Sequence, residues 1–194
     1  MILAELPAQM VDTRVGSVAV AEPELSAPRS GSPLALRLAQ VSDAEAIRTI
    51  YNHEVLHTFA TFDLVPRTLE EQQDWIAKRS GAFAAIVAVD GPTVVGFGSL
   101  SAYKERAAYR TSVEDSVYVA GDQQGRGIGK LIVNELLHIA RVSGFHAVFA
   151  RISGPSEASR ALHASCGFSL VGIEREVGRK FNKWLDVAIM QVLL

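Results

Sequence analysis

Three glycines at alternate positions, between a predicted strand and a predicted helix, constrain this chain more than any other feature. The stretch reads Gln123-Gln124-Gly125-Arg126-Gly127-Ile128-Gly129-Lys130. Residues 112–120 before it alternate and predict a β-strand, and residues 131–143 after it predict a helix. Because the first turn of a helix has unpaired N–H groups and a partial positive charge, this junction can bind a phosphate group.

The spacing of these glycines excludes two common phosphate loops. It matches neither the Walker pattern G-x-x-x-x-G-K-[ST] nor the dinucleotide pattern G-x-G-x-x-G. Instead, Gln124-x-x-Gly127-x-Gly129 resembles the loop that holds the pyrophosphate of acyl-coenzyme A in GCN5-related N-acetyltransferases. Glycines lack a Cβ, so they let the chain bend tightly against a ligand. An ordinary turn from strand to helix is the alternative that the motif alone leaves open.

The composition is that of an ordinary globular protein and narrows the classes of partner. Hydrophobic residues make up 48% of the 194 positions, charged residues 21%, and the formal net charge is −2. A balance so near neutrality argues against a general nucleic-acid or membrane-surface binder. No apolar run approaches the roughly 18 residues of a membrane span. The first residues also lack the basic segment of a secretory signal.

Cysteine and histidine usage points to a cytoplasmic protein without a metal. Cys166 is the single cysteine, so no internal disulfide can form, and this fits a reducing compartment. The five histidines have no spacing, with cysteine or with one another, that suggests zinc. We therefore expect a cytoplasmic location and no metal site.

The chain divides into an extension and one folded domain. Residues 1–33 contain four prolines and several serines, and neither a helical nor a strand period persists there. We expect a flexible extension, in which Val18-Ala19-Val20 is the one short alternation compatible with a strand. Residues 34–194 form the predicted domain.

Periodicity within 34–194 predicts the order β-α-α-β-β-β-α-β-α-β-β. Capping boxes at 42–45 and 68–71 start the first two helices, which end near Leu56 and Lys78. The fourth helix starts at Pro155 or Ser156 and ends at Gly167. The strands are predicted at 34–39, 83–89, 94–103, 112–120, 147–152, 168–176 and 184–192.

This order resembles the fold of the GCN5-related N-acetyltransferase (GNAT) superfamily, an α/β (α+β) fold with a mixed central sheet flanked by helices. Five sequence blocks resemble one subfamily more closely, the phosphinothricin and methionine sulfoximine N-acetyltransferases. The blocks lie at 50–55, 61–63, 113–119, 158–163 and 178–187. The resemblance covers residues 36–194. It implies transfer of an acetyl group from acetyl-CoA to a free primary amine.

The resemblance assigns Glu114 as the general base that deprotonates the amine, directly or through water. Strand alternation places Glu114 and Tyr118 on one face and the neighbouring valines on the other. The alternative for Glu114 is a solvated carboxylate or an ion pair with Arg110. His163 lies where relatives place a group near the thiolate, as an acid or a second base. Its alternative is a helix histidine satisfied by a nearby carbonyl.

The resemblance also assigns residues to the cofactor. The backbone of one strand pairs with the pantetheine arm, the glycine loop holds the pyrophosphate, and a serine stands where many relatives have asparagine. These residues are Val117, Tyr118, Val119, Gln124, Gly125, Arg126, Gly127, Ile128, Gly129, Lys130 and Ser156. Since a hydroxyl can replace only part of an amide's bonding, we expect a weakened contact at the serine. Cys166 is expected to be a small core residue.

The predicted acceptor residues are Phe62, Lys104, Arg106, Tyr109 and Glu114. Two cations among them suit an acceptor with a carboxylate and a phosphinate, sulfoximine or sulfone group. Acetylation of such analogues is a detoxification. A plain amino acid, a polyamine or a protein N-terminus is the alternative acceptor, and a non-catalytic acyl-CoA-binding module is the alternative class.

Aromatic and basic residues between the last two predicted strands suggest a subunit contact. Arg179, Lys180, Phe181 and Trp184 are expected to form a loop there. In the resembled subfamily this region reaches the active site of the other subunit, so we expect a homodimer. A surface hairpin without a partner is the alternative.

Overall fold

The computed structural model describes residues 34–194, which form a seven-stranded sheet in the order β1-β2-β3-β4-β5-β7-β6. The predicted extension 1–33 and the short strand suggested within it lie outside the described residues. The strands are β1 (Leu34–Leu38), β2 (Ala85–Asp90), β3 (Thr93–Ala102), β4 (Ser112–Val119), β5 (Ala147–Ser153), β6 (Ser169–Lys180) and β7 (Lys183–Leu193). The helices are α1 (Ala44–His57), α2 (Leu69–Ala77), α3 (Ile128–Val142) and α4 (Glu157–Ser165). The predicted order of elements is confirmed.

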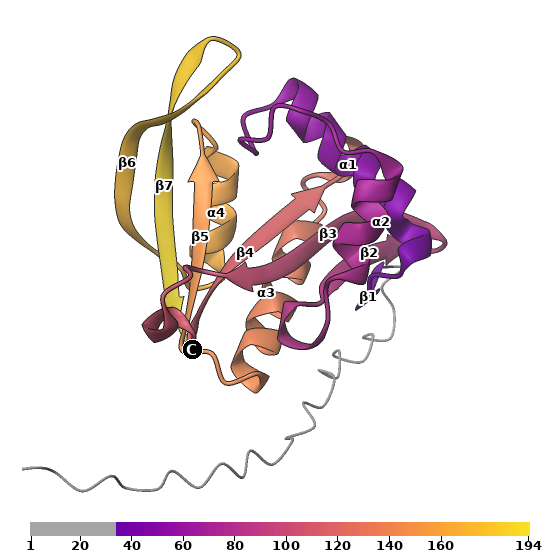
Figure 1. Cartoon of the computed structure of the whole chain (residues 1–194), viewed down its shortest axis with the longest axis horizontal. Helices are drawn as coiled ribbons and strands as arrows, with labels where there is room; N and C mark the ends of the chain where they lie inside the picture. The colour runs from indigo at the N-terminus through magenta and orange to yellow at the C-terminus, as the bar shows by residue number, and fades with distance from the viewer. Residues whose placement is uncertain (1–33) are drawn as a thin grey trace, which may run out of the picture.

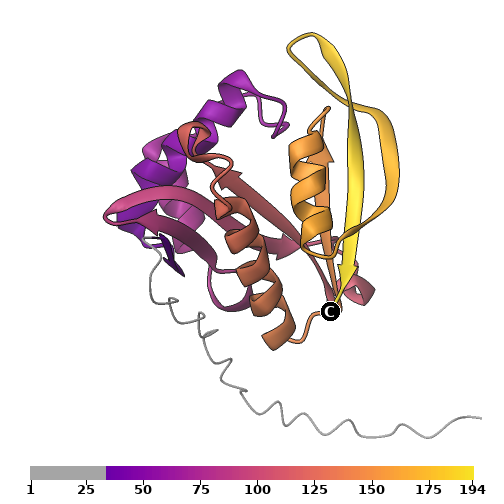
Figure 2. The same ribbon diagram turned by 180° about the vertical axis from the view of Figure 1, so that it is seen from behind.

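Helices cover both faces of the sheet, but unequally. Figure 1 shows α1 and α2 over one face of β2–β4, and Figure 2 shows α3 and α4 over the opposite face. Alternation along β2 divides the core accordingly: Ile86 packs in the cluster around α3, and Val87 packs in the cluster around α1. The face of β5–β7 on the α1 side carries no helix (Figure 1).

The two glycines within β3 let α3 sit directly on the sheet. A Cβ at Gly98 would lie 2.5 Å from the Cγ2 atom of Ile132, and one at Gly96 would lie 2.9 Å from the carbonyl oxygen of Tyr118. Only glycine tolerates both contacts. The expected close approach of another backbone is found at Gly96, where the nearest atom is the Tyr118 carbonyl oxygen, whereas at Gly98 the nearest atom belongs to the Ile132 side chain.

The decisive feature of the sheet is the separation of β4 from β5. These are the only parallel neighbours among the strands of residues 34–194, and they pair only from Ser112–Glu114 to Ala147–Phe149. Beyond Glu114 the two strands diverge, as the V-shaped opening between them in Figure 1 shows. Backbone groups along the rest of β4 therefore face a gap.

Two local predictions were wrong, and each has a simple cause. Ser42 does not cap α1: a 3-10 turn, Val41–Asp43, precedes the helix, and the carboxylate of Asp43 accepts from the N–H of Gln40 at 2.8 Å. The expected loop at 179–184 is a tight hairpin, because Phe181 and Asn182 take positive φ angles of 47° and 60°. Such a two-residue turn extends both strands into the predicted loop.

The predicted ends of α2 and α4 are confirmed at Thr68, Ser156 and Gly167. Thr68 and Glu71 form the capping box of α2, with the Thr68 hydroxyl accepting from the Glu71 N–H. Ser156 is the N-cap of α4, and Gly167 follows that helix with φ +94°. Cys166 is partly buried against the main core. No helix within residues 34–194 is long and apolar enough to cross a membrane.

Candidate active site

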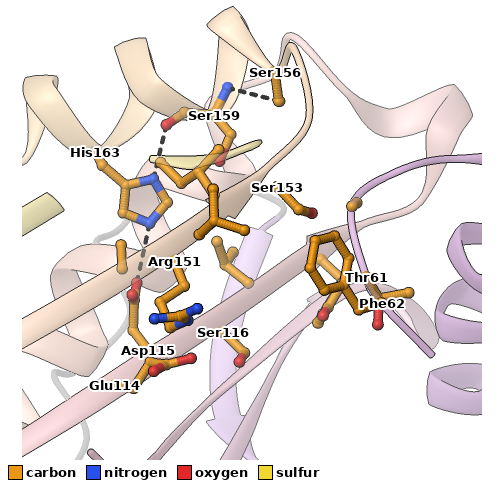
Figure 3. A pocket seen from close by; sticks show the side chains of 16 residues that line it. Thr61, Phe62, Glu114, Asp115, Ser116, Arg151, Ser153, Ser156, Ser159 and His163 are labelled. Carbon is orange, nitrogen blue, oxygen red and sulfur yellow. Dashed lines mark hydrogen bonds and ion pairs between the residues drawn. The ribbon is translucent and has the colours of Figure 1, made fainter. Parts of the chain in front are cut away.

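A cavity of about 250 Å³, the central cavity, lies where β4 and β5 diverge. Its wall comes from β4, β5, α4, one residue of β7 and the loop after α1, so elements far apart in sequence meet there. Figure 3 shows its labelled polar side chains pointing toward one another. The lining includes Thr61, Phe62, Glu114, Asp115, Ser116, Arg151, Ser153, Ser156, Ser159 and His163.

Glu114 lines this cavity from the last position at which β4 pairs with β5. Its side chain is half-buried, and burial is the main reason that its pKa is raised above the ordinary value of 4.5. The charges of Asp115 and Glu174 raise that pKa further, whereas Arg151 lowers it. A half-buried carboxylate with a raised pKa, at an open cavity, has the properties of a general base. The neighbouring cation is Arg151, rather than the Arg110 that the sequence suggested.

His163 is buried on α4 and is hydrogen-bonded at both ring nitrogens. Its Nδ1 lies 2.7 Å from the carbonyl oxygen of Ser159, and its Nε2 lies 3.1 Å from Oδ2 of Asp115 (Figure 3). Burial lowers the pKa of His163, but the hydrogen bond and the charge of Asp115 outweigh burial, and the pKa is raised. Because both nitrogens face acceptors, the doubly protonated ring satisfies both, which argues against a role as a second base.

Asp115 was missed by the sequence reasoning. Its side chain is buried, and its second oxygen, Oδ1, has no hydrogen-bond partner in residues 34–194. The signal was present, because Asp115 stands among Val113, Val117 and Val119 on the face of β4 that packs toward α3. An acid at an inward position of a strand requires a partner, and it predicts a buried pair.

A second cavity, of about 410 Å³, forms a groove along the part of β4 that does not pair with β5 and leads to the glycine loop. Gly125 and Gly127 both take left-handed φ angles, 78° and 80°, which explains why glycine is used there. Ten of the predicted cofactor residues line this cavity: Val117, Tyr118, Val119, Gln124, Gly125, Gly127, Ile128, Gly129, Lys130 and Ser156. Since α3 begins at Ile128, its unpaired N–H groups lie at one end of the cavity.

The side chain of Arg126 does not line this groove. Its guanidinium forms an ion pair with Asp90 at 2.8 Å and also bonds to the side chain of Gln123. Arg126 is not among the residues that line the groove. Gly129 has a packing role as well, because a Cβ there would lie 2.9 Å from the Cδ2 atom of Leu162 on α4.

Ser156 lies where the two cavities meet. Its hydroxyl accepts from the N–H of Ser159 at 3.4 Å, a long bond that caps α4. The hydroxyl proton is left to donate to a ligand. A serine here can therefore cap the helix and still make one contact, fewer than an asparagine amide would supply.

Phe62 lines the central cavity, and the β6–β7 hairpin holds it there. A Cβ at Gly178 would lie 2.2 Å from a ring atom of Phe62, so the hairpin contacts the ring only because residue 178 is glycine. The buried ammonium of Lys180 donates to the carbonyls of Thr61 and Glu54, at 2.9 and 3.2 Å. These contacts join the hairpin tip to the loop that forms one wall of the cavity.

The other predicted acceptor residues lie elsewhere. Lys104, Arg106 and Tyr109 form a separate cavity with Glu105 in the loop between β3 and β4, and none of them lines the central cavity. The ammonium of Lys104 lies over the rings of Tyr103 and Tyr109, 4.7 and 5.3 Å from their centroids. The predicted grouping of these cations with Glu114 is therefore wrong in this structure. No three His, Cys, Asp or Glu side chains within 34–194 are grouped to hold a metal ion.

An open sheet with a strand facing a groove, and a glycine-rich helix start at the end of that groove, is the arrangement expected of an acyltransferase that uses coenzyme A. Comparison with known families agrees. The sequence model of the family described as "Acetyltransferase (GNAT) domain" matches residues 36–189. The chain belongs to the GNAT acetyltransferase family. The family, the fold and the enzyme class expected from the sequence are confirmed.

Named relatives lie close to the chain in sequence and in structure. A phosphinothricin N-acetyltransferase of Streptomyces coelicolor is 41% identical over 75% of this chain and 88% of its own length. An L-methionine sulfoximine/L-methionine sulfone acetyltransferase of Pseudomonas paraeruginosa is 36% identical over 82% of this chain and 94% of its own. A phosphinothricin acetyltransferase structure from Sinorhizobium meliloti, in complex with acetyl-CoA, has a TM-score of 0.78 at 35% identity, covering 84% and 89%.

Proposed function

We propose that this enzyme transfers the acetyl group of acetyl-CoA to the α-amino group of a small amino-acid acceptor. The acceptor class is that of phosphinothricin, methionine sulfoximine and methionine sulfone, which the names of its relatives carry. The observation that carries the proposal is the position of Glu114. It is a carboxylate of raised pKa at the cavity that joins the groove beside the glycine loop.

The chemistry follows from this arrangement. The groove holds the donor, with the N-terminus of α3 toward its diphosphate and the free edge of β4 toward its pantetheine arm. Glu114 accepts a proton from the ammonium form of the acceptor, directly or through water. The neutral nitrogen attacks the thioester carbon and the C–S bond breaks. The acylated nitrogen loses its extra proton, and the departing thiolate takes up that proton.

We assign His163 to the charge balance of the site rather than to proton abstraction. Its Nε2 lies against the Asp115 carboxylate and its Nδ1 against the Ser159 carbonyl, so it balances the buried charge of Asp115 in the wall of the cavity. This role explains a histidine whose nitrogens both face acceptors within the protein.

Two further assignments extend this proposal. The enzyme acts in the cytoplasm, which is consistent with the free thiol of Cys166. Its physiological task is detoxification, because acetylation removes the charge of an amino group that an amino-acid analogue needs in order to mimic its natural counterpart.

A screen of coenzyme A release tests the proposed function. With acetyl-CoA, we expect turnover with phosphinothricin, methionine sulfoximine or methionine sulfone, and far less with polyamines or peptides. Turnover confined to polyamines would replace the acceptor class and keep the reaction. Binding of acetyl-CoA without coenzyme A release from any amine would contradict the proposal and favour a binding module.

We also propose that the enzyme is a homodimer formed through β6. This strand ends the sheet, so one row of its backbone groups has no neighbouring strand. The β6–β7 hairpin exposes more large apolar side chains than the surface of a soluble monomer usually does. They are Leu170, Val171, Ile173, Val177, Phe181 and Trp184.

Light scattering of the purified protein tests the dimer. We expect twice the mass of one chain, and a monomer for Ile173→Asp, because a carboxylate at a buried interface is costly. Val41→Asp is the matched control, since Val41 is 48% exposed and follows β1, which lies at the opposite edge of the sheet from β6. A monomeric parent protein, or a dimer that survives Ile173→Asp, would contradict the assignment.

A further inference from the structure

Arg151 lies on the acceptor side of the gap, and no sequence motif drew attention to it. We propose that Arg151 binds the carboxylate of the acceptor amino acid, and that Glu174 holds its guanidinium in position for that contact. The inference rests on the proposed N-acetyltransferase function, and it names the residue that selects an acceptor carrying a carboxylate.

Strand register places Arg151 next to the proposed base. Phe149 of β5 pairs with Glu114 of β4, and Arg151 follows two residues later, so its side chain projects from the same face as that of Phe149. Arg151 and Glu114 both line the central cavity, and Figure 3 shows the guanidinium beside the Glu114 carboxylate. The electrostatic influence of each on the other agrees with this proximity.

Glu174 fixes the guanidinium and leaves it able to bind a second anion. Nη1 and Nη2 of Arg151 donate to the two carboxylate oxygens of Glu174 at 3.2 and 2.5 Å. Arginine has five N–H donors, so three are left after this two-point contact. The Arg151 side chain is 34% exposed, and a pair so open to water adds little stability, which favours a positioning role for Glu174.

The chemistry of an α-amino acid requires a cation close to the base. Its nitrogen and its carboxylate are bonded to the same carbon, so an amine placed at Glu114 brings the carboxylate to the immediate neighbourhood. Among the lining residues of the central cavity within 34–194, Arg151 is the only arginine or lysine. A planar guanidinium can also hold both oxygens of a carboxylate at once.

The other candidate cations have different surroundings. Lys104 lies over two tyrosine rings in the separate cavity, and Arg126 is paired with Asp90. Lys180 is buried, with its ammonium bonded to two carbonyls. His163 lines the central cavity but donates to groups of the protein itself. The geometry thus selects Arg151 for the carboxylate.

Kinetics with matched acceptors test this assignment. Methionine sulfone and its carboxamide are compared at saturating acetyl-CoA over a range of pH, because loss of Arg151 raises the pKa of Glu114 further. For Arg151→Gln we expect KM for the acid to rise about 10- to 100-fold, the value of a charge-assisted hydrogen bond. KM for the carboxamide and KM for acetyl-CoA should stay within about twofold of the parent values, and any change in kcat should be the same for both acceptors.

Three further variants sharpen the test. Arg151→Lys should recover part of the affinity for the acid, because a point charge replaces a two-point contact. Glu174→Gln should raise KM for the acid a few-fold and leave the carboxamide unaffected. Lys104→Gln is the matched control, which removes a cation outside the cavity and should affect both acceptors equally.

The outcomes separate this inference from the proposed function. An equal rise in KM for the acid and for the carboxamide in Arg151→Gln would overturn the role of Arg151. A rise in KM for the acid alone in Lys104→Gln would overturn it as well. In both cases the enzyme would remain an N-acetyltransferase. Failure of the parent enzyme to acetylate either compound would contradict the proposed function itself. Acetyl-CoA binding by each variant shows that it is folded.

Discussion

Glu114→Gln is expected to lower kcat about a thousandfold, within the range of roughly 10²–10⁴ for the loss of a general base. Glutamine keeps the size and the hydrogen-bonding capacity of the side chain but cannot accept the proton of the acceptor ammonium. KM for acetyl-CoA should change little, because the groove and the glycine loop are formed by other residues. Coenzyme A release under saturating conditions measures the effect.

The pH profile identifies the group that is lost. Burial raises the pKa of Glu114 above 4.5, so the activity of the parent enzyme should fall as the pH drops through that raised value. In Glu114→Gln the residual activity should lack this acidic limb. Glu70→Gln, at an exposed position in the first turn of α2, is the control and should match the parent. Normal turnover with an unchanged profile in Glu114→Gln would rule out the base.

The second large effect is expected on stability, from Asp115→Asn. The ion pair of Asp115 with His163 is almost fully buried, with side-chain exposures of 1% and 4%. Removal of one partner from a buried pair costs about 3 kcal/mol or more, because the other charge is left without compensation. We therefore expect a clearly lower urea midpoint for Asp115→Asn at about pH 6, with the parent protein measured alongside.

The pH dependence of that loss has a definite sign. The pKa of His163 is raised above 6.5 in the folded protein, so the pair contributes stability that is fully present below 6.5 and is lost as the pH rises through the folded value. The deficit of Asp115→Asn should therefore shrink as the pH rises through the raised pKa of His163. The double variant Asp115→Asn/His163→Gln should lose this dependence. A deficit that is independent of pH would show that His163 is not charged in the fold.

Local patterns predicted most of the architecture correctly. The alternation of residues 112–120 predicted β4 and the face on which Glu114 lies, because side-chain direction in a strand depends only on position along it. The capping box at Thr68 predicted the start of α2, since its bonds join residues three apart. The Ser42 prediction failed because Ser42 lies inside a 3-10 turn, Val41–Asp43, that precedes α1 and is held by bonds from Gln40 and Arg37 to the Asp43 carboxylate.

The contents of the site were harder to predict, because its contacts span the chain. Asp115 and His163 are 48 residues apart, and Lys180 reaches the Glu54 carbonyl across 126. A motif cannot show such pairs. The sequence directed attention to Lys104 and Arg106, two cations in a short segment that also contains two tyrosines. Arg151 is a single cation within a strand, and no sequence pattern singles it out.

The sequence by itself determined the order of elements, the glycine loop and the face that bears Glu114, because each follows from periods and backbone preferences that act over a few residues. The resemblance of five sequence blocks indicated the GNAT family. Only the tertiary structure decided which side chains meet at the gap. That depends on where β4 and β5 stop pairing and on the registers of β5 and β6 with β7, which bring Arg151 toward Glu114 and Glu174. Register is set by the packing of the whole sheet, so no single segment contains it.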